Sequence, residues 1–276
     1  MQIFDSHQHF WQLNNPFTDW PTADLRAIYR DYTPERLRLI LDANRISETI
    51  LVQAAPSVAE TEYCFALAKR ADFVKGVVGW IDFESGDALK QLDRLAANPA
   101  LRGLRPMVQS ISEPGWLLKD EFAPVFGAMV DYGLTFDGLV LANQLNDLAA
   151  LAKLYPKLNI VLDHAGKPLI ASGDFETWER AVSRLAAAPN VWCKLSGLWT
   201  EAGKDISANA MRPWVAHLLA SFGTGRLMWG SDWPVINLVG GYKGWLDQCF
   251  DLMSGLKPTE LEDIFWNNGR HFYGVA

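Results

Sequence analysis

Two histidines lie two positions apart near the start of this chain, in the segment FDSHQHFW at residues 4–11. The 276 residues contain only five histidines, so His7 and His9 are a marked local concentration. If the segment is a strand, residues two apart point to the same face, and both imidazoles can hold one ion or one substrate. A single histidine at a strand end is more often a structural residue, so the pair needs partners before it predicts a site.

The rest of the chain predicts eight strands that would position such partners. Short apolar runs rich in β-forming residues recur, and we expect strands at residues 2–6, 48–53, 74–81, 101–107, 134–140, 159–163, 191–195 and 226–230. Stretches with helical spacing separate them, and no two-residue hairpin turn joins them, which favours parallel pairing through crossovers. The closed form of eight such units is the (β/α)8 TIM barrel. We expect one such domain over residues 1–276; an open doubly wound sheet is the alternative, but no nucleotide-binding glycine motif follows any strand.

Polar residues gather at the carboxyl ends of the predicted strands, where barrel enzymes build their active sites. His164 follows the sixth strand and Asp232 follows the eighth, so both can lie across the barrel mouth from His7 and His9. Three imidazoles and a carboxylate suit one Zn²⁺ or a similar divalent ion. Without metal, the same groups could orient a carbonyl and activate water by general base catalysis. The residues alone leave both versions open.

Composition excludes some classes of binding partner and indicates a cellular compartment. The formal charge of −7 and the pI near 5.3 argue against nucleic acid or an anionic membrane as a partner. No run approaches the roughly 18 apolar residues of a membrane span. We see no signal peptide, and three scattered cysteines, Cys64, Cys193 and Cys249, are typical of reduced thiols in a cytoplasmic protein.

Four motifs in this order resemble the amidohydrolase superfamily, and within it the lactonase-like branch: FDSHQHFW, VLDHAGKP, CKLSGL and GSDWP. The resemblance covers essentially the whole chain and implies a (β/α)8 barrel that opens sugar lactones, such as L-fucono- or L-rhamnonolactone. It implies that Asp232 is the general base toward water, with His7, His9 and His164 beside it. No lysine suited to carbamylation occurs at the expected place, so the resemblance implies one metal at most, and some similar proteins work without any.

Several further residues are candidates for binding the substrate. Arg105 could bind a ring oxygen or a carboxylate, Asp137 lies in the fifth strand, and Lys194 could donate to hydroxyl groups or pair with Asp163 or Asp137. Indole rings pack on sugar faces, and five tryptophans fall at or beyond predicted strand ends: Trp11, Trp80, Trp116, Trp199 and Trp233. In the long irregular stretch 10–33, Trp20 and Tyr29 could form a lid.

Two rival functions remain at this point. A metal-dependent decarboxylase or hydratase acting on an aromatic or dicarboxylic acid could use the same barrel. A non-catalytic sugar-acid binder would not need all four of His7, His9, His164 and Asp232. The expected partner is a small-molecule sugar lactone, and a homo-oligomer is compatible with the sequence.

Overall fold

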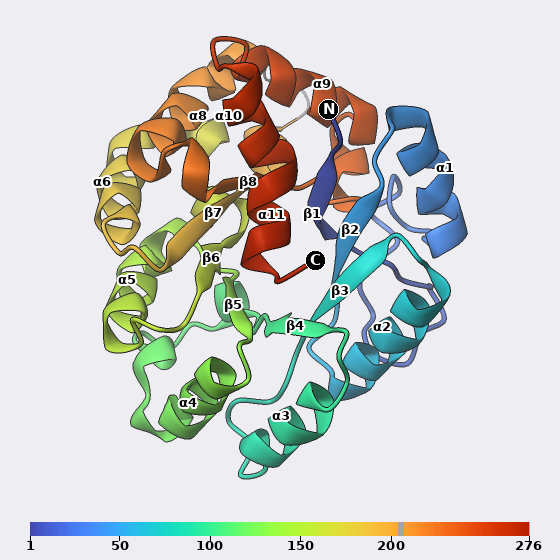
Figure 1. The fold of residues 1–276 in the computed structure, drawn as a ribbon, viewed down its shortest axis with the longest axis vertical. Coiled ribbons are helices and arrows are strands. Elements are labelled where there is room, and N and C mark those ends of the chain that lie inside the picture. The colour runs from blue at the N-terminus through green and yellow to red at the C-terminus, as the bar shows by residue number, and fades with distance from the viewer. Residues whose placement is uncertain (204–206, 276) are drawn as a thin grey trace.

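Eight parallel strands form the centre of the molecule, as predicted, and helices surround them (Figure 1). The computed structural model describes residues 1–203 and 207–275. Consecutive strands pair in parallel from first to last, and a bridge between Gln8 and Trp233 brings the last strand back beside the first. The strands are β1 (Phe4–Gln8), β2 (Glu48–Val52), β3 (Val74–Gly79), β4 (Leu101–Leu104), β5 (Thr135–Gly138), β6 (Ile160–Leu162), β7 (Val191–Leu195) and β8 (Leu227–Trp229). The chain therefore folds as a (β/α)8 barrel.

The helices follow the expected periodicity and local signals. Thr33 and Pro34 open the first helix as its N-cap and first residue, and Ser57 caps the second by accepting from the Glu60 N–H. The helices are α1 (Pro34–Asn44), α2 (Val58–Arg70), α3 (Ala88–Ala96), α4 (Ala123–Asp131), α5 (Leu145–Leu154), α6 (Phe175–Ala186), α7 (Leu198–Ala202), α8 (Ala208–Phe222), α9 (Tyr242–Leu252), α10 (Pro258–Glu262) and α11 (Asn268–Phe272).

The last helix closes the amino-terminal end of the barrel. In Figure 1, α11 lies across the opening between β1 and β8. The α-carbon of Gly269 in this helix lies so close to the Phe4 ring, at the start of β1, that a side chain there would collide with it. Phe272 and Tyr273 are buried in one cluster with inward residues of the strands, including Val52 and Met228. Access to the barrel interior is therefore from the opposite end, where the strands finish.

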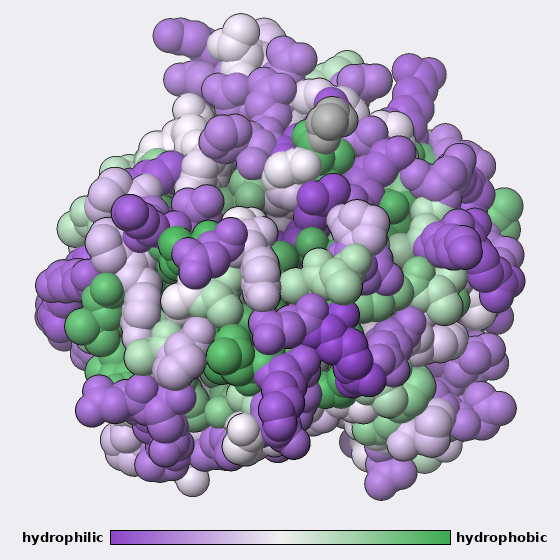
Figure 2. Space-filling view, turned by 60° about the horizontal axis from the view of Figure 1, so that its bottom comes forward, coloured by the Kyte–Doolittle hydropathy of each residue, from purple (hydrophilic) through white to green (hydrophobic). Residues whose placement is uncertain are grey.

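The outer surface is mainly polar. Figure 2 shows hydrophilic side chains over most of one face, with hydrophobic ones in small separate areas. Among the described residues, no helix has the length and apolar character needed to cross a membrane.

Candidate active site

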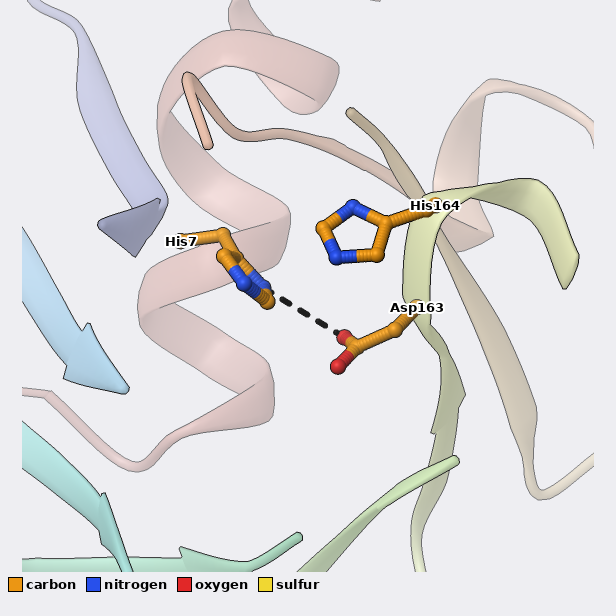
Figure 3. A group of neighbouring side chains, drawn as sticks. All are labelled: His7, Asp163 and His164. Atoms are coloured by element: carbon orange, nitrogen blue, oxygen red, sulfur yellow. Dashed lines mark ion pairs between the residues drawn. The ribbon is translucent and has the colours of Figure 1, made fainter. Parts of the chain in front are cut away.

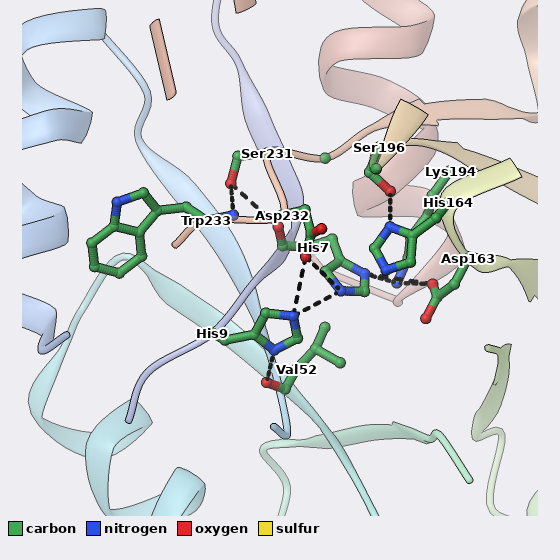
Figure 4. Close-up of polar contacts among 12 residues, drawn as sticks. His7, His9, Val52, Asp163, His164, Lys194, Ser196, Ser231, Asp232 and Trp233 are labelled. Atoms are coloured by element: carbon green, nitrogen blue, oxygen red, sulfur yellow. Dashed lines mark hydrogen bonds and ion pairs between the residues drawn. The ribbon is translucent and has the colours of Figure 1, made fainter. Parts of the chain in front are cut away.

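His7, His9 and Asp232 meet at the carboxyl end of β1, where the bridge to the segment after β8 joins the barrel (Figure 4). The Nε2 atoms of His7 and His9 lie 3.1 Å apart, which confirms that both side chains point to one face. Asp232 Oδ1 lies 3.3 Å from His9 Nε2 and 3.8 Å from His7 Nε2. The segment after β8 is aligned by the Asp232 N–H, which donates to the His7 carbonyl at 2.8 Å.

Buried hydrogen bonds fix the orientation of two of the histidine rings. His9 Nδ1 lies 2.7 Å from the Val52 carbonyl, an acceptor, so Nδ1 carries the hydrogen and Nε2 presents a lone pair to the site. His164 Nδ1 lies 2.9 Å from Ser196 Oγ. These contacts come from β2 and from the end of β7, so neighbouring strands set the direction of each imidazole.

The backbone around the site takes an unusual conformation. His164, Ala165 and Lys167 have φ values of 52°, 53° and 49°, Gly166 has 72°, and Asp232 has 54°. Left-handed backbone costs a non-glycine residue roughly 1–2 kcal/mol, and such strain concentrates at functional sites. Gly197 shows how tightly the turn is held, because a Cβ added there would lie 2.7 Å from the His164 ring.

A fully buried charge cluster lies beneath His7. Lys194 Nζ is 2.6 Å from Asp137 Oδ2, 2.9 Å from Asp163 Oδ1 and 3.0 Å from His7 Nδ1. Two of the ammonium's hydrogens therefore have carboxylate acceptors, and His7 Nδ1 accepts the third when the imidazole hydrogen is on Nε2. The Tyr273 hydroxyl donates to Asp137 Oδ2 at 2.7 Å and so ties α11 to this cluster. Figure 3 shows Asp163 directed at His7, 3.5 Å from Nδ1, with the His164 ring beside it.

Burial and neighbouring charges set the protonation of the site. Burial lowers the pKa of His164 to about 4, and burial followed by the Lys194 charge lowers the pKa of His7 well below its usual value. Both imidazoles are therefore neutral near pH 7. Burial alone would raise the pKa of the Asp232 carboxyl, but the imidazoles of His164 and His9 outweigh it and hold that pKa below its usual value. Asp232 is consequently a carboxylate at neutral pH.

The Asp5 side chain, in β1, joins this strand to the segment after β8. From the sequence alone, Asp5 could equally have been a helix cap or a turn former. Its Oδ1 accepts from the His7 N–H at 3.1 Å and from the Ser231 N–H at 2.8 Å. Its Oδ2 accepts from the Tyr242 hydroxyl at 2.8 Å. The two backbone segments that carry His7 and Asp232 are thus joined through one carboxyl group.

A cavity of about 520 Å³ opens above these groups, within the usual size of a small-molecule site. Of the predicted residues, His9, His164, Asp232 and Arg105 line it. Arg105 donates through Nη2 to the Gln53 carbonyl and lies 3.7 Å from Asp163 through Nη1. The cavity is also lined by apolar residues, among them Trp20, Pro56, Met107, Leu139, Val235 and Leu238. Trp20 therefore lies where the lid was expected, whereas Tyr29 lines only an adjoining surface hollow that shares Thr18 and Trp20 with the cavity.

The tryptophan predictions need correction, because none of the five predicted indoles lines the cavity. Trp11 is buried, packs on Trp20 and Tyr32, and donates through Nε1 to the Arg30 carbonyl. Trp116 is buried against Phe83 and Phe122. The other three also lie outside the lining: Trp80 binds Thr61 through its backbone, the Trp199 ring packs on Gly240, and Trp233 is buried beside Phe10.

Lys194 and Asp137 also differ from the expected substrate contacts. Both side chains are fully buried beneath the histidines, so the alternative in which Lys194 pairs with Asp163 and Asp137 is the one observed. Beyond the predicted residues, the cavity is lined by two charged side chains, Lys167 and Glu201, by the amide of Gln109, and by the hydroxyls of Thr18, Ser110 and Thr200. Lys167 belongs to the VLDHAGKP motif, so the motif contained a signal for it that we did not use.

The donor atoms fit one divalent ion. His7 Nε2, His9 Nε2 and Asp232 Oδ1 form a triangle with sides of 3.1, 3.3 and 3.8 Å. The circle through these three atoms has a radius of about 2.0 Å, which equals the usual Zn–N and Zn–O bond length. His7, Asp163 and His164 form a second group of potential ligands. The Lys194 ammonium already supplies positive charge to that second group, at Asp163 and His7 Nδ1.

Known proteins resemble this chain over its whole length. The sequence pattern of the amidohydrolase family matches residues 4–275. L-fucono-1,5-lactonase of Burkholderia ambifaria is 43% identical, with 98% of this chain and 95% of that protein covered. L-fucono-1,5-lactonase of Burkholderia multivorans is 34% identical over 86% of this chain and 84% of its own length. A crystal structure of an amidohydrolase from Burkholderia multivorans with bound zinc has 31% identity and a TM-score of 0.93, with both chains fully covered.

Proposed function

Because the chain belongs to the amidohydrolase family, we propose that it is an enzyme that hydrolyses the ester bond of a sugar lactone. L-Fucono-1,5-lactone is the first candidate, since two proteins with that name are 43% and 34% identical to this chain over most of its length. The observation that carries the proposal is the cavity in which the Asp232 carboxylate, His9 and His164 meet. These groups suit the attack of water on an ester carbonyl.

Asp232 would act as the general base. It is ionised at neutral pH, it lines the cavity, and its Oδ1 lies 3.3 Å from His9 Nε2. A water molecule hydrogen-bonded to this carboxylate loses its proton to Asp232 as its oxygen attacks the carbonyl carbon. When the ring opens, the protonated Asp232 returns that proton to the departing alkoxide oxygen.

Arg105 and the His164 imidazole would stabilise the charge that develops on the carbonyl oxygen. His164 lines the cavity and is neutral near pH 7, so its imidazole would act as a hydrogen-bonding group and not as a cation. The Arg105 guanidinium lines the same cavity, and its planar set of N–H donors suits a developing oxyanion. Preorganised donors of this kind lower the barrier because they are aimed before the charge forms.

A divalent ion would be held by His7, His9 and Asp232, with zinc the first candidate because the similar Burkholderia multivorans structure contains it. A bound ion of this type polarises a carbonyl and lowers the pKa of water. Without a bound ion, the same residues would orient the substrate directly.

The test is a pH-indicator assay of a panel of aldonolactones, which includes L-fuconolactone and L-rhamnonolactone, with and without a chelator. We expect fast hydrolysis of at least one sugar lactone and release of the corresponding hydroxy acid. Hydrolysis that continues in the presence of the chelator would show that the reaction needs no metal, and the proposed roles of the residues would stand. No hydrolysis of any lactone, or CO₂ release from an aromatic acid in a parallel assay, would overturn the proposal.

A further inference from the structure

Three polar side chains form one wall of the cavity, which we call the polar wall: Gln109, Lys167 and Glu201. Lys167 Nζ donates to Gln109 Oε1 at 2.9 Å and lies 3.4 Å from Glu201 Oε1. The water-activating chemistry described above uses none of the three. Their function should therefore involve a part of the bound ligand other than the ester group.

The polar wall is assembled from three separate strand–helix connections. Gln109 follows β4, Lys167 follows β6, and Glu201 is in α7 after β7. The Gln109 N–H donates to the Leu139 carbonyl at 2.9 Å, and the Glu201 N–H donates to the Gly197 carbonyl at 3.1 Å. Gln109 is thus anchored to the segment after β5, whereas Glu201 is held within the first turn of its own helix.

Lys167 and His164 belong to the same left-handed turn, which runs over residues 164–167. The Lys167 N–H closes this turn by donating to the His164 carbonyl at 2.9 Å, and the Trp178 indole holds it by donating to the Ala165 carbonyl at 2.7 Å. Because both side chains line the cavity, the strained turn places the ammonium at a fixed position relative to a catalytic imidazole.

The polar wall retains capacity for a ligand. The contacts with Gln109 and Glu201 engage two of the three hydrogens of the Lys167 ammonium, and the Glu201 carboxylate has a second oxygen. The Lys167 and Glu201 side chains are 26% and 24% exposed, so they are restrained but still reachable. A hydroxyl group both donates and accepts, and neighbouring hydroxyls on a ring can meet an ammonium and a carboxylate side by side.

We propose that the polar wall binds the ring hydroxyls of the substrate and makes the enzyme selective for hydroxylated over unsubstituted lactones. This inference rests on the proposed lactonase function and adds the residues that recognise the polyol face. The histidines and Asp232 act on the ester group, which every lactone has. The polar wall acts on the hydroxyls, which only sugar lactones have, and is a specificity-determining group.

The test compares Lys167→Met and Glu201→Gln with the wild type on L-fuconolactone and on δ-valerolactone, which has no hydroxyl groups. We expect Lys167→Met to lower kcat/KM for the sugar lactone about 10- to 100-fold, the size of one charged hydrogen bond. The loss on δ-valerolactone should be at least tenfold smaller. If that lactone is turned over too slowly, its inhibition constant against the sugar lactone replaces its kcat/KM. Lys153→Met, at an exposed lysine of α5, is the control and should leave kcat/KM for both lactones unchanged.

The outcomes separate this inference from the proposed function. Equal losses on both lactones would mean that the polar wall only braces the three connections, and would overturn the inference. No loss on either lactone would overturn it as well. If Lys167→Met does not fold, the nearly isosteric Glu201→Gln decides by the same ratio. If the wild type hydrolyses neither lactone, the proposed function itself fails.

Discussion

Replacing Lys194 by methionine would test the buried charge cluster directly. The substitution removes an ammonium that lies 2.6 Å from Asp137 Oδ2 and 2.9 Å from Asp163 Oδ1, and all three side chains are fully buried. Methionine retains most of the volume, so the main change is the loss of positive charge between two carboxylates. Tyr273 would still donate to Asp137, and Asp163 would keep only the more distant Arg105 guanidinium, at 3.7 Å.

We expect the variant to lose about 3–5 kcal/mol of unfolding free energy, the usual cost of removing one partner from a buried ion pair. The loss should depend on pH. Without the ammonium, burial raises the pKa of the two carboxyls in the folded state above the value of about 3.9 in the unfolded chain. A raised carboxyl pKa means that stability is retained at low pH and lost as pH rises through the folded-state value. The deficit should therefore be larger at pH 8 than at pH 5.

Urea unfolding followed by tryptophan fluorescence at pH 5, 7 and 8 measures this difference. Lys243→Met is a matched control, because Lys243 Nζ also lies 2.6 Å from its partner Asp247 in a pair whose side chains are 69% and 59% exposed. An exposed pair of this kind contributes only about 0.3–0.5 kcal/mol. The reasoning would be refuted if both variants lost similar stability, or if the Lys194→Met deficit did not change with pH.

Three further predictions follow from the site and its surroundings. Asp232→Asn should lower kcat at least about 10²-fold while circular dichroism shows an intact fold, since it removes the general base. Gly197→Ala should lower both stability and kcat, because φ is +68° and the new Cβ would meet the His164 ring at 2.7 Å; thermal unfolding and steady-state kinetics measure these effects. Burial raises the pKa of Glu60 from 4.5 to about 7, so its ionisation lowers the free energy of unfolding as pH rises through 7. Glu60→Gln should therefore gain stability relative to the wild type between pH 5 and pH 8, as measured by urea unfolding.

Each of these has a clear contrary result. Wild-type turnover in Asp232→Asn would remove that residue from the mechanism. An alanine at position 197 that leaves kcat and melting temperature unchanged would show that the turn at His164 adapts easily. A stability difference between Glu60→Gln and the wild type that is constant from pH 5 to pH 8 would show that Glu60 does not titrate in this range.

The strands and the grouping of His7, His9 and Asp232 could be predicted because they depend on short-range patterns. Apolar runs without hairpin turns indicated eight parallel strands, and the strand at Val191–Leu195 has its predicted bounds. The first strand was placed at residues 2–6, but it spans Phe4–Gln8 because its pairing with β2 continues beyond Ser6. The common direction of His7 and His9 followed from strand periodicity alone and is confirmed by their 3.1 Å contact.

The walls of the cavity were harder to predict because they depend on packing between distant segments. A tryptophan satisfies its one N–H with a single carbonyl, as Trp11 does at Arg30, and sequence does not tell whether its ring then lies in a core or a cavity. The left-handed turn at residues 164–167 has one glycine, and nothing in the types of His164, Ala165 and Lys167 signals their positive φ values. The polar wall depends on that turn.

The contact between α11 and the buried charge cluster has a consequence for biosynthesis. His7 is made among the first residues and Tyr273 among the last of those described, yet the Tyr273 hydroxyl completes the coordination of Asp137 beneath the catalytic histidines. During translation at about 5–20 residues per second, every strand is made before the residue that closes the barrel base. A chain truncated before α11 would contain all the proposed catalytic side chains but leave the base of the cluster open to water. Catalytic competence would thus arise only after the segment that carries Tyr273 has been made and has packed beneath the barrel.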